Sequence, residues 1–251
     1  MDLAAHKSDY DRDGVVVVRQ LLSPDDFREL QANLDRYIRE IVPTLPDGDA
    51  FYDDRSRPET LKQMQHMGCD PFFRDIPSHP RWKELATALV GEEVNGLAPE
   101  WFNKPPGTNH VTPPHQDNYY FCLRPSNVVT IWMALDHVDA ENGCLRYLPG
   151  SHRQGIRPHG RSNILGFSQG ILNYGADDYL REREIHLEPG DVVAHHGDTV
   201  HRADANRSTT RNRRAFAIVY QGVSCERDSA AFSRYQTALK SQHTQLGLNV
   251  S

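Results

Sequence analysis

A series of short β-type segments, beginning at about residue 95, constrains the fold of this chain more than any other feature. The clearest segment spans residues 127–135, in which side chains alternate between two faces of a predicted strand. One face carries Thr130, Trp132 and Ala134, and the other carries Val129, Ile131, Met133 and Leu135. Further strands are predicted at 144–148, 192–195 and 213–221, between turns marked by Gly and Pro. Many short strands with such turns favour a sandwich or barrel over alternating βα units.

The first 94 residues have a different pattern, in which helical signals predominate. Ser23 and Pro24 predict a helix start, and apolar residues then recur at helical spacing until Pro43. Other predicted elements are a strand at 15–18, a loop at 46–58, a helix between Pro80 and Gly91, and a closing helix at 230–243. We therefore expect one domain over residues 1–251, with a mainly helical part at 1–94, a β-core at 95–224 and a C-terminal helix at 225–251.

The composition argues against several classes of function. The net charge of −6 disfavours a nucleic-acid partner, and no segment approaches the roughly 18 apolar residues of a membrane span. The first residues lack the apolar core of a secretory signal, and the four cysteines are widely spaced without a C-x-x-C pair. We therefore expect a cytoplasmic protein with reduced thiols. The 13 histidines suggest a metal site, because histidine is the commonest metal ligand.

The most informative motif for chemistry is His115-Gln116-Asp117. Residues two apart on a strand point to the same side, so this imidazole and this carboxylate can face one site. With one distant histidine they would form the 2-His-1-carboxylate triad, which holds Fe(II) on one face and leaves the opposite positions open. The candidates for the third ligand are His195, His196 and His201. His195 and His196 end a predicted strand, and we interpret them as one core residue and one rim residue.

A second requirement concerns the electrons that Fe(II) needs to activate O₂, for which 2-oxoglutarate is a common donor. The distal carboxylate of 2-oxoglutarate needs a cation, and the arginine fork binds a carboxylate through two hydrogen bonds. Arg213 opens the last predicted strand and shares a face with Ala215 and Ala217, whose small side chains leave room for a dicarboxylate. Arg211 and Arg214 remain alternatives, because a shift of one residue in register exchanges the two faces.

Between Asn103 and about Val223, an ordered set of motifs resembles the phytanoyl-CoA dioxygenase family of Fe(II)- and 2-oxoglutarate-dependent oxygenases. The motifs are Asn103-Lys104-Pro105-Pro106, His115-Gln116-Asp117, Trp132-Met133-Ala134-Leu135, Glu141-Asn142-Gly143-Cys144-Leu145, Leu148-Pro149-Gly150-Ser151-His152, Pro189-Gly190-Asp191, His201, Asn206-Arg207-Ser208 and Arg213-Arg214-Ala215. The family fold is a double-stranded β-helix, a cupin-like jelly roll, which agrees with the mainly β pattern and flanking helices predicted above.

The resemblance also implies roles for individual residues. Iron would be held by His115, Asp117 and His201, and 2-oxoglutarate by Arg213, with Lys104 and Trp132 lining its site. The implied reaction is the hydroxylation of a small-molecule substrate with O₂, which releases succinate and CO₂. The carboxylate of Asp117 favours a hydroxylase, because related halogenases have a small residue at this position.

Candidate substrate contacts come from segments near these residues. Tyr119 and Tyr120 directly follow the predicted metal-binding motif, and Gln65 lies in the segment at 63–67. Asn173 lies in the long segment at 155–181, which is a predicted lid because long loops in compact domains are often functional.

Functions from other classes are also compatible with parts of this pattern. A cupin-like metalloenzyme, an isomerase or hydrolase that does not use 2-oxoglutarate, would use the same triad but would leave Arg213 and Lys104 without a carboxylate to bind. A non-catalytic sensor is disfavoured, because all three metal ligands are present. The pattern does not indicate an oligomeric state.

Overall fold

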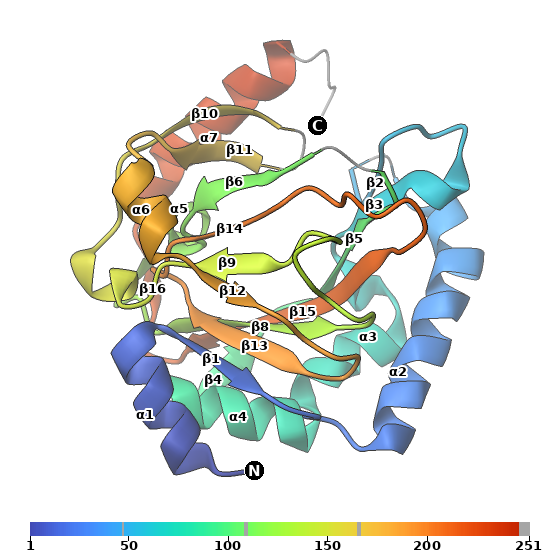
Figure 1. Cartoon of the computed structure of the whole chain (residues 1–251), viewed down its shortest axis with the longest axis horizontal. Helices are drawn as coiled ribbons and strands as arrows, with labels where there is room; N and C mark the ends of the chain where they lie inside the picture. Colours follow the sequence, from blue (N-terminus) through green and yellow to red (C-terminus); the bar gives the residue numbers. More distant parts are fainter. Residues whose placement is uncertain (47, 108–109, 165–166, 246–251) are drawn as a thin grey trace.

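The computed structural model describes residues 1–46, 48–107, 110–164 and 167–245, and two antiparallel sheets form its centre (Figure 1). The main sheet has the strand order β1-β13-β8-β15-β5-β3-β2, and β4 also pairs with β15. Its strands are β1 (Val15–Val18), β2 (Ala50–Tyr52), β3 (Leu61–Met64), β4 (Val94–Gly96), β5 (Glu100–Lys104), β8 (Val128–Ala134), β13 (Val192–His196) and β15 (Arg213–Gly222).

The smaller sheet has the strand order β12-β9-β14-β6 and faces the main sheet. Side chains from both sheets meet in one hydrophobic cluster, which includes Trp132 of β8 and Tyr147 of β9. The smaller sheet consists of β6 (Thr112–His115), β9 (Leu145–Tyr147), β12 (Arg183–Ile185) and β14 (His201–Ala203). Two further strand pairs are β10 (His159–Ile164) with β11 (Phe167–Ile171), which lies against β6, and β7 (Leu123–Arg124) with β16 (Glu226–Arg227).

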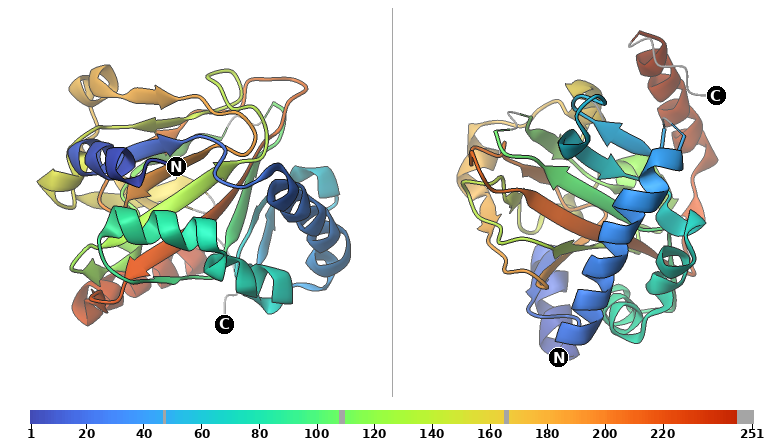
Figure 2. Two further views of the ribbon diagram at one scale, coloured as in Figure 1. Left: turned by 90° about the horizontal axis from the view of Figure 1, so that it is seen from below. Right: turned by 90° about the vertical axis from the view of Figure 1, so that its right-hand side faces the viewer.

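Helices from the N-terminal part cover the outer face of the main sheet, and Figure 2 shows α1 and α4 side by side there. These helices are α1 (Leu3–Asp13), α2 (Pro24–Arg36), α3 (Pro71–Asp75) and α4 (Pro80–Val90). The other helices are α5 (Asn118–Phe121), α6 (Ala176–Arg181) and α7 (Ser229–Gln245). Among the described residues, no helix has the length and apolar character that crossing a membrane requires.

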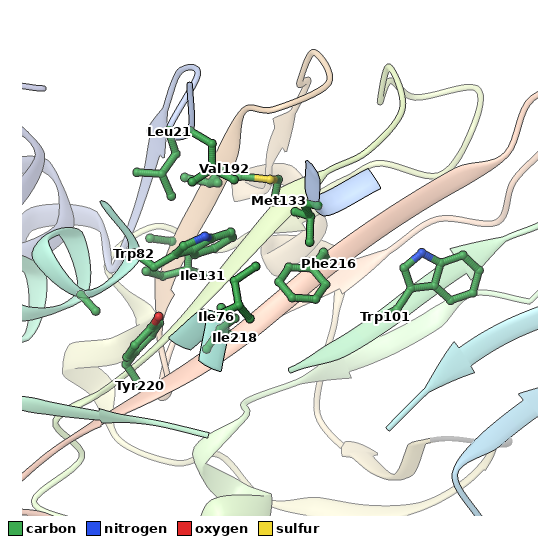
Figure 3. Close-up of a cluster of buried hydrophobic side chains, with 14 of the residues drawn as sticks. Leu21, Ile76, Trp82, Trp101, Ile131, Met133, Val192, Phe216, Ile218 and Tyr220 are labelled. Atoms are coloured by element: carbon green, nitrogen blue, oxygen red, sulfur yellow. The ribbon is translucent and has the colours of Figure 1, made fainter. Parts of the chain in front are cut away.

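The larger hydrophobic core lies between the main sheet and these helices (Figure 3). The ring of Phe216 on β15 lies 6.0 Å from Trp82 of α4 and 5.9 Å from Phe73 of α3. On β8, Ile131 and Met133 belong to this outer core, whereas Trp132 and Ala134 belong to the cluster between the sheets. The alternation predicted for this strand is therefore confirmed, as is the mainly β, jelly-roll class of the fold with flanking helices.

The helix predicted after Ser23 begins where expected and ends earlier. Ser23 is the N-cap of α2, and its Oγ accepts a hydrogen bond from the backbone N–H of Asp26 at 3.1 Å. The α-helix ends at Arg36 and continues as a π-helical turn over Tyr37–Ile41 and a 3₁₀ turn over Val42–Thr44. Tyr37 is fully buried in this turn, with its ring 5.2 Å from that of Phe73.

Two parts of the N-terminal region differ from the prediction. Residues 46–58, predicted to be a loop, contain β2, which pairs with β3 at the edge of the main sheet. The prediction also lacks α1, because this helix has few apolar residues and buries mainly Tyr10 and Asp13. Because β1 to β4 all join the main sheet, the N-terminal part supplies strands to the β-core as well as the helices that cover it.

Candidate metal centre and co-substrate site

His115 and His201 lie opposite each other on neighbouring strands of the smaller sheet. They are direct partners in the pairing of β6 with β14, and their ring centroids are 4.1 Å apart. In each residue, Nδ1 is close to the backbone carbonyl two residues earlier, at 2.8 Å from Pro113 O and 3.0 Å from Thr199 O. A carbonyl oxygen only accepts hydrogen bonds, so Nδ1 carries the proton and the lone pair of Nε2 is directed toward a metal.

Asp117 lies outside the strand, contrary to the expectation from the sequence. β6 ends at His115, and Asp117 has helical backbone angles (φ −59°, ψ −39°) where α5 begins. Its Oδ1 nevertheless lies 3.4 Å from Nε2 of His115 and 3.5 Å from Nε2 of His201. Two ligand atoms about 2.1 Å from one octahedral ion are about 3 Å apart, so the three atoms are close to the spacing for a single metal ion. The donor set fits Fe(II), because two imidazoles and one carboxylate on one side leave the other positions open.

The second oxygen of Asp117 is held by protein groups. Oδ2 accepts a hydrogen bond from Thr130 Oγ1 at 2.7 Å and another from His195 Nε2 at 3.0 Å. Because Nε2 of His195 donates to the carboxylate, its Nδ1 accepts, and the partner at 3.0 Å is the hydroxyl of Tyr147. Tyr147, His195 and Thr130 therefore fix the orientation of Asp117, with Oδ1 facing the two histidines.

The role of His195 is the main feature of the site that the sequence reasoning missed. His195 is buried, as a core residue would be, but it contacts Asp117 directly. His196 faces the opposite side of β13, where its ring lies 6.1 Å from that of Tyr10. The register between β13 and β8 could have indicated this role. His195 is the direct partner of Thr130 in that pairing, so both side chains lie on the inner face.

The protonation of the centre favours metal binding. Burial lowers the pKa of His201 well below its usual value, and the nearby His115 and His195 lower it further, so the ring is neutral. Burial alone would raise the pKa of Asp117, but the neighbouring histidines, of which His195 donates a hydrogen bond to Oδ2, bring it well below its usual value. Neutral imidazoles and an ionised carboxylate are the forms in which these side chains bind a metal.

Two buried cations lie next to each other on the inner face of the main sheet. Lys104 of β5 and Arg213 of β15 are direct partners in the strand pairing and are 7% and 4% exposed. Burial lowers the pKa of Lys104 well below its usual value and that of Arg213 to about 10. Within the described part of the chain, neither side chain has a carboxylate partner, and Nε of Arg213 has no hydrogen-bond partner. Buried charges are normally paired, so this arrangement fits a bound anion such as the distal carboxylate of 2-oxoglutarate.

The structure distinguishes the three candidate arginines. Arg211 pairs with Asp139 at 2.9 Å and with Glu141, and Arg214 forms several hydrogen bonds with Asp136, the shortest at 2.7 Å. Both arginines are therefore occupied outside the inner face. Arg213 is the arginine that points between the sheets, where its guanidinium carbon lies 5.3 Å from the ring centre of Trp132. Tyr147 links this region to the metal centre, because the charges of both Asp117 and Arg213 act on its hydroxyl.

The predicted substrate contacts lie in different surroundings. Tyr120 is close to the centre, with its ring 6.0 Å from that of His115, and its hydroxyl donates to the backbone oxygen of Gln169 at 2.6 Å. Tyr119 stacks on His159 of β10 at 4.0 Å. Both tyrosines thus contact the β10–β11 hairpin in the predicted lid, of which residues 165–166 lie outside the described residues.

The other two predicted contacts lie away from these groups. Asn173 is exposed and accepts hydrogen bonds from Arg157 at 3.1 and 3.2 Å, which attaches the segment to its neighbour. Gln65 follows the end of β3, and its backbone N–H donates to Asp49 O at 2.9 Å. Two positions earlier, Gln63 lies within β3 and is buried.

A second group of potential ligands, Cys144, Glu184 and His186, lies on the smaller sheet. The Arg146 guanidinium lies 2.5 Å from the carboxylate of Glu184, and burial raises the pKa of the Cys144 thiol to about 11. A neighbouring cation and a protonated thiol both disfavour a metal ion, so we assign the metal centre to the His115 group.

Comparisons with known proteins agree with this geometry. A profile of the phytanoyl-CoA dioxygenase (PhyH) family matches residues 10–215. The peroxisomal phytanoyl-CoA dioxygenase of Mus musculus is 30% identical over 236 residues, covering 86% of this chain and 68% of the mouse protein. The human counterpart is 26% identical over 235 residues, with coverage of 86% and 67%.

Solved structures with the same fold contain the expected cofactors. The epimerase SnoN, in complex with Fe³⁺, α-ketoglutarate and nogalamycin RO, superposes with a TM-score of 0.71 at 23% identity, covering 89% of this chain and 84% of SnoN. EvdO2 from Micromonospora carbonacea var. aurantiaca, complexed with 2-oxoglutarate, has a TM-score of 0.70 at 24% identity, with coverage of 90% and 92%. Because the family profile matches most of its length, the chain belongs to the phytanoyl-CoA dioxygenase family.

Proposed function

We propose that the protein is an Fe(II)- and 2-oxoglutarate-dependent dioxygenase that hydroxylates a small molecule, with release of succinate and CO₂. Two neighbouring features carry the proposal. The first is the cluster of possible metal ligands, His115, Asp117 and His201, and the second is the buried pair of Lys104 and Arg213 between the sheets. The three metal ligands alone also suit the cupin-like isomerase or hydrolase. Lys104 and Arg213, which have no carboxylate partner in the described part of the chain, favour a dicarboxylate co-substrate and so favour the dioxygenase.

The proposed function gives separate roles to the residues that bind the metal, those that orient a ligand and those that bind the co-substrate. His115, Asp117 and His201 hold the iron, which when bound supplies the activation of O₂ and the removal of a hydrogen atom from the substrate. Tyr147, His195 and Thr130 orient Asp117. Lys104 and Arg213 bind the distal carboxylate and so orient the keto-acid end toward the metal.

The surrounding residues contribute to specificity and enclosure. Trp132 packs beside Arg213 and shields the cations from water, which strengthens their attraction for an anion. Tyr120 and the β10–β11 hairpin border the open side of the metal centre near His115 and are where a substrate would contact the protein. We retain Tyr119, Gln65 and Asn173 as weaker candidates, and the predicted cytoplasmic location stays a prediction.

The first experiment measures 2-oxoglutarate binding and turnover in matched arginine variants. Calorimetry of the Mn(II)-loaded, oxygen-free protein is expected to show 2-oxoglutarate binding that Arg213→Ala weakens by about 10-fold to 100-fold, since a charged hydrogen-bond pair is lost. Arg214→Ala, which removes a neighbouring arginine paired with Asp136, is the control and is expected to leave binding within about twofold.

Turnover then separates the candidate functions. With Fe(II), 2-oxoglutarate and O₂, slow succinate formation is expected from the unaltered protein and none from His115→Ala. Absence of both 2-oxoglutarate binding and succinate formation would reject the dioxygenase and favour the cupin-like metalloenzyme. Once a substrate is found, mass spectrometry of its product distinguishes hydroxylation, which adds one oxygen atom, from an epimerisation, which leaves the mass unchanged.

A further inference from the structure

An acidic side chain, Glu100, lies on the same inner face as the cation pair and has no role in the function proposed above. Along β5, Trp101 belongs to the outer core, whereas Phe102 packs against the cluster between the sheets. Side chains alternate along a strand, so Glu100, Phe102 and Lys104 all face inward. Glu100 is the direct partner of Ala217, which in turn is the direct partner of Trp132. The small Ala217 side chain therefore lies between Glu100 and Trp132, which packs beside Arg213.

The charge of Glu100 lacks the compensation that other buried acids of this protein have. Asp70 pairs with Arg36 at 2.9 Å, and Asp191 pairs with Arg19 at 2.6 Å. Within the described ranges, no cationic side chain lies within 4.0 Å of the Glu100 carboxylate. Its hydrogen-bond partner is Nε2 of Gln63, at a long 3.4 Å. Burial raises the pKa of Glu100 to about 7, and the charge of Asp117 adds to this effect, whereas Gln63 and His66 oppose it.

Gln63 adds a second acceptor beside this carboxylate. It lies on β3 as the direct partner of Phe102, so it is a diagonal neighbour of Glu100 on the inner face. Because its Nε2 donates to Glu100, its Oε1 is left as an acceptor, and no described residue donates to that oxygen. Glu100 and Phe102 are also partly exposed, whereas Trp101 on the opposite face is buried, so this end of the interior is open to solvent.

We propose that Glu100 and Gln63 recognise the substrate and select one that presents a positively charged nitrogen group, such as an ammonium or guanidinium. Such a group carries several N–H donors, which match the carboxylate and the amide oxygen. A hydrocarbon group at this place would leave the Glu100 carboxylate with only the long hydrogen bond from Gln63 and would displace water from its charge. This inference rests on the proposed function, since it assumes that the metal and 2-oxoglutarate occupy the sites described above.

The test uses three probes that share one ring and differ in one group: benzylamine, benzyl alcohol and benzoate. The protein is loaded with Mn(II), which accelerates the nuclear relaxation of protons bound near it, and with saturating 2-oxoglutarate, which occupies Lys104 and Arg213. Relaxation of the probe protons then reports binding close to the metal. We expect benzylamine to bind more tightly than benzyl alcohol, and benzoate to bind least.

Matched variants assign this preference to a residue. Glu100→Gln keeps the shape of the side chain and is expected to weaken benzylamine binding by about tenfold or more while leaving benzyl alcohol nearly unchanged. Glu226→Gln, at an exposed position on β16, is the control and is expected to behave like the unaltered protein. Thermal unfolding of each variant shows that any loss of binding occurs in folded protein.

The outcomes separate this inference from the proposed function. If the unaltered protein does not prefer benzylamine to benzoate, or binds neither, the assignment of a cationic substrate is wrong. If benzylamine binding persists in Glu100→Gln, the amine binds elsewhere, for example directly to the metal, and the assignment is equally wrong. In both cases Mn(II) and 2-oxoglutarate would still bind. If they do not bind to the unaltered protein, the proposed function itself fails.

Discussion

The strands β8 and β15 carry different kinds of side chain on their two faces. On the outer face, Ile131, Met133 and Phe216 are fully buried against the helices, and their packing stabilises the fold. On the inner face, Thr130 donates a hydrogen bond to Asp117, and Arg213 is buried without a carboxylate partner among the described residues. One sheet therefore separates stability from function: its outer face packs against the helices, and its inner face carries polar groups that lie around the proposed metal and co-substrate sites.

The largest expected effect is on stability and comes from the outer face. Phe216→Ala removes a fully buried ring that packs on Trp82 and Phe73, and we expect it to lower the free energy of unfolding by about 3–5 kcal/mol. Urea unfolding followed by circular dichroism measures this loss. The matched variant is Phe102→Ala on the inner face, where the ring is only partly buried, and we expect a loss of about 1–2 kcal/mol. Equal losses in the two variants would contradict the separation of roles.

The next effect concerns metal affinity and the inner face of β13. His195→Phe removes the hydrogen bond to Asp117 Oδ2 while keeping a ring of similar size, and we expect Mn(II) affinity to fall by about 10-fold to 100-fold. Calorimetric titration with Mn(II) provides the measurement. The adjacent His196→Phe lies on the opposite face and should leave the affinity within about twofold. Equal losses in both variants would mean that His195 acts through the general packing of β13.

The smallest effect concerns the pH dependence of stability and tests the polar inner face. The pKa of Glu100 is raised to about 7 in the folded protein, from a usual value near 4.5, so the folded state favours the protonated carboxyl. Its contribution to stability is fully present below about pH 4.5 and is lost as the pH rises through about 7. At pH 8 we therefore expect Glu100→Gln to be more stable than the unaltered protein by about 1–3 kcal/mol, an amount reduced by the partial exposure of the side chain.

Urea unfolding of both proteins at pH 5 and pH 8 provides the measurement for Glu100. The difference between the variant and the unaltered protein should be larger at pH 8 than at pH 5. The same difference at both pH values would show that Glu100 is well solvated, and would weaken its assignment as a substrate contact.

Local patterns were sufficient for much of the fold and for the cluster of residues that we propose as metal ligands. The alternation at 127–135 identified both faces of β8, and Ser23 marked the start of α2, because each depends on neighbours in the chain. The spacing of His115 and Asp117 identified a ligand pair, although a helical turn and not a strand positions the carboxylate. The edge strand β2 was missed, because its pairing with β3 depends on tertiary contacts more than on its short sequence.

The sequence by itself determined which residues had the chemistry for a metal and a dicarboxylate, and how the side chains of β8 alternate between its two faces. Only the tertiary structure distinguished Arg213 from Arg211 and Arg214, because the carboxylate partners of the latter two come from other segments of the chain. It likewise placed His195 on Asp117 and Gln63 beside Glu100. The physical reason is that these contacts join residues 78 and 37 positions apart, and such contacts follow from the register between strands, which no local pattern encodes.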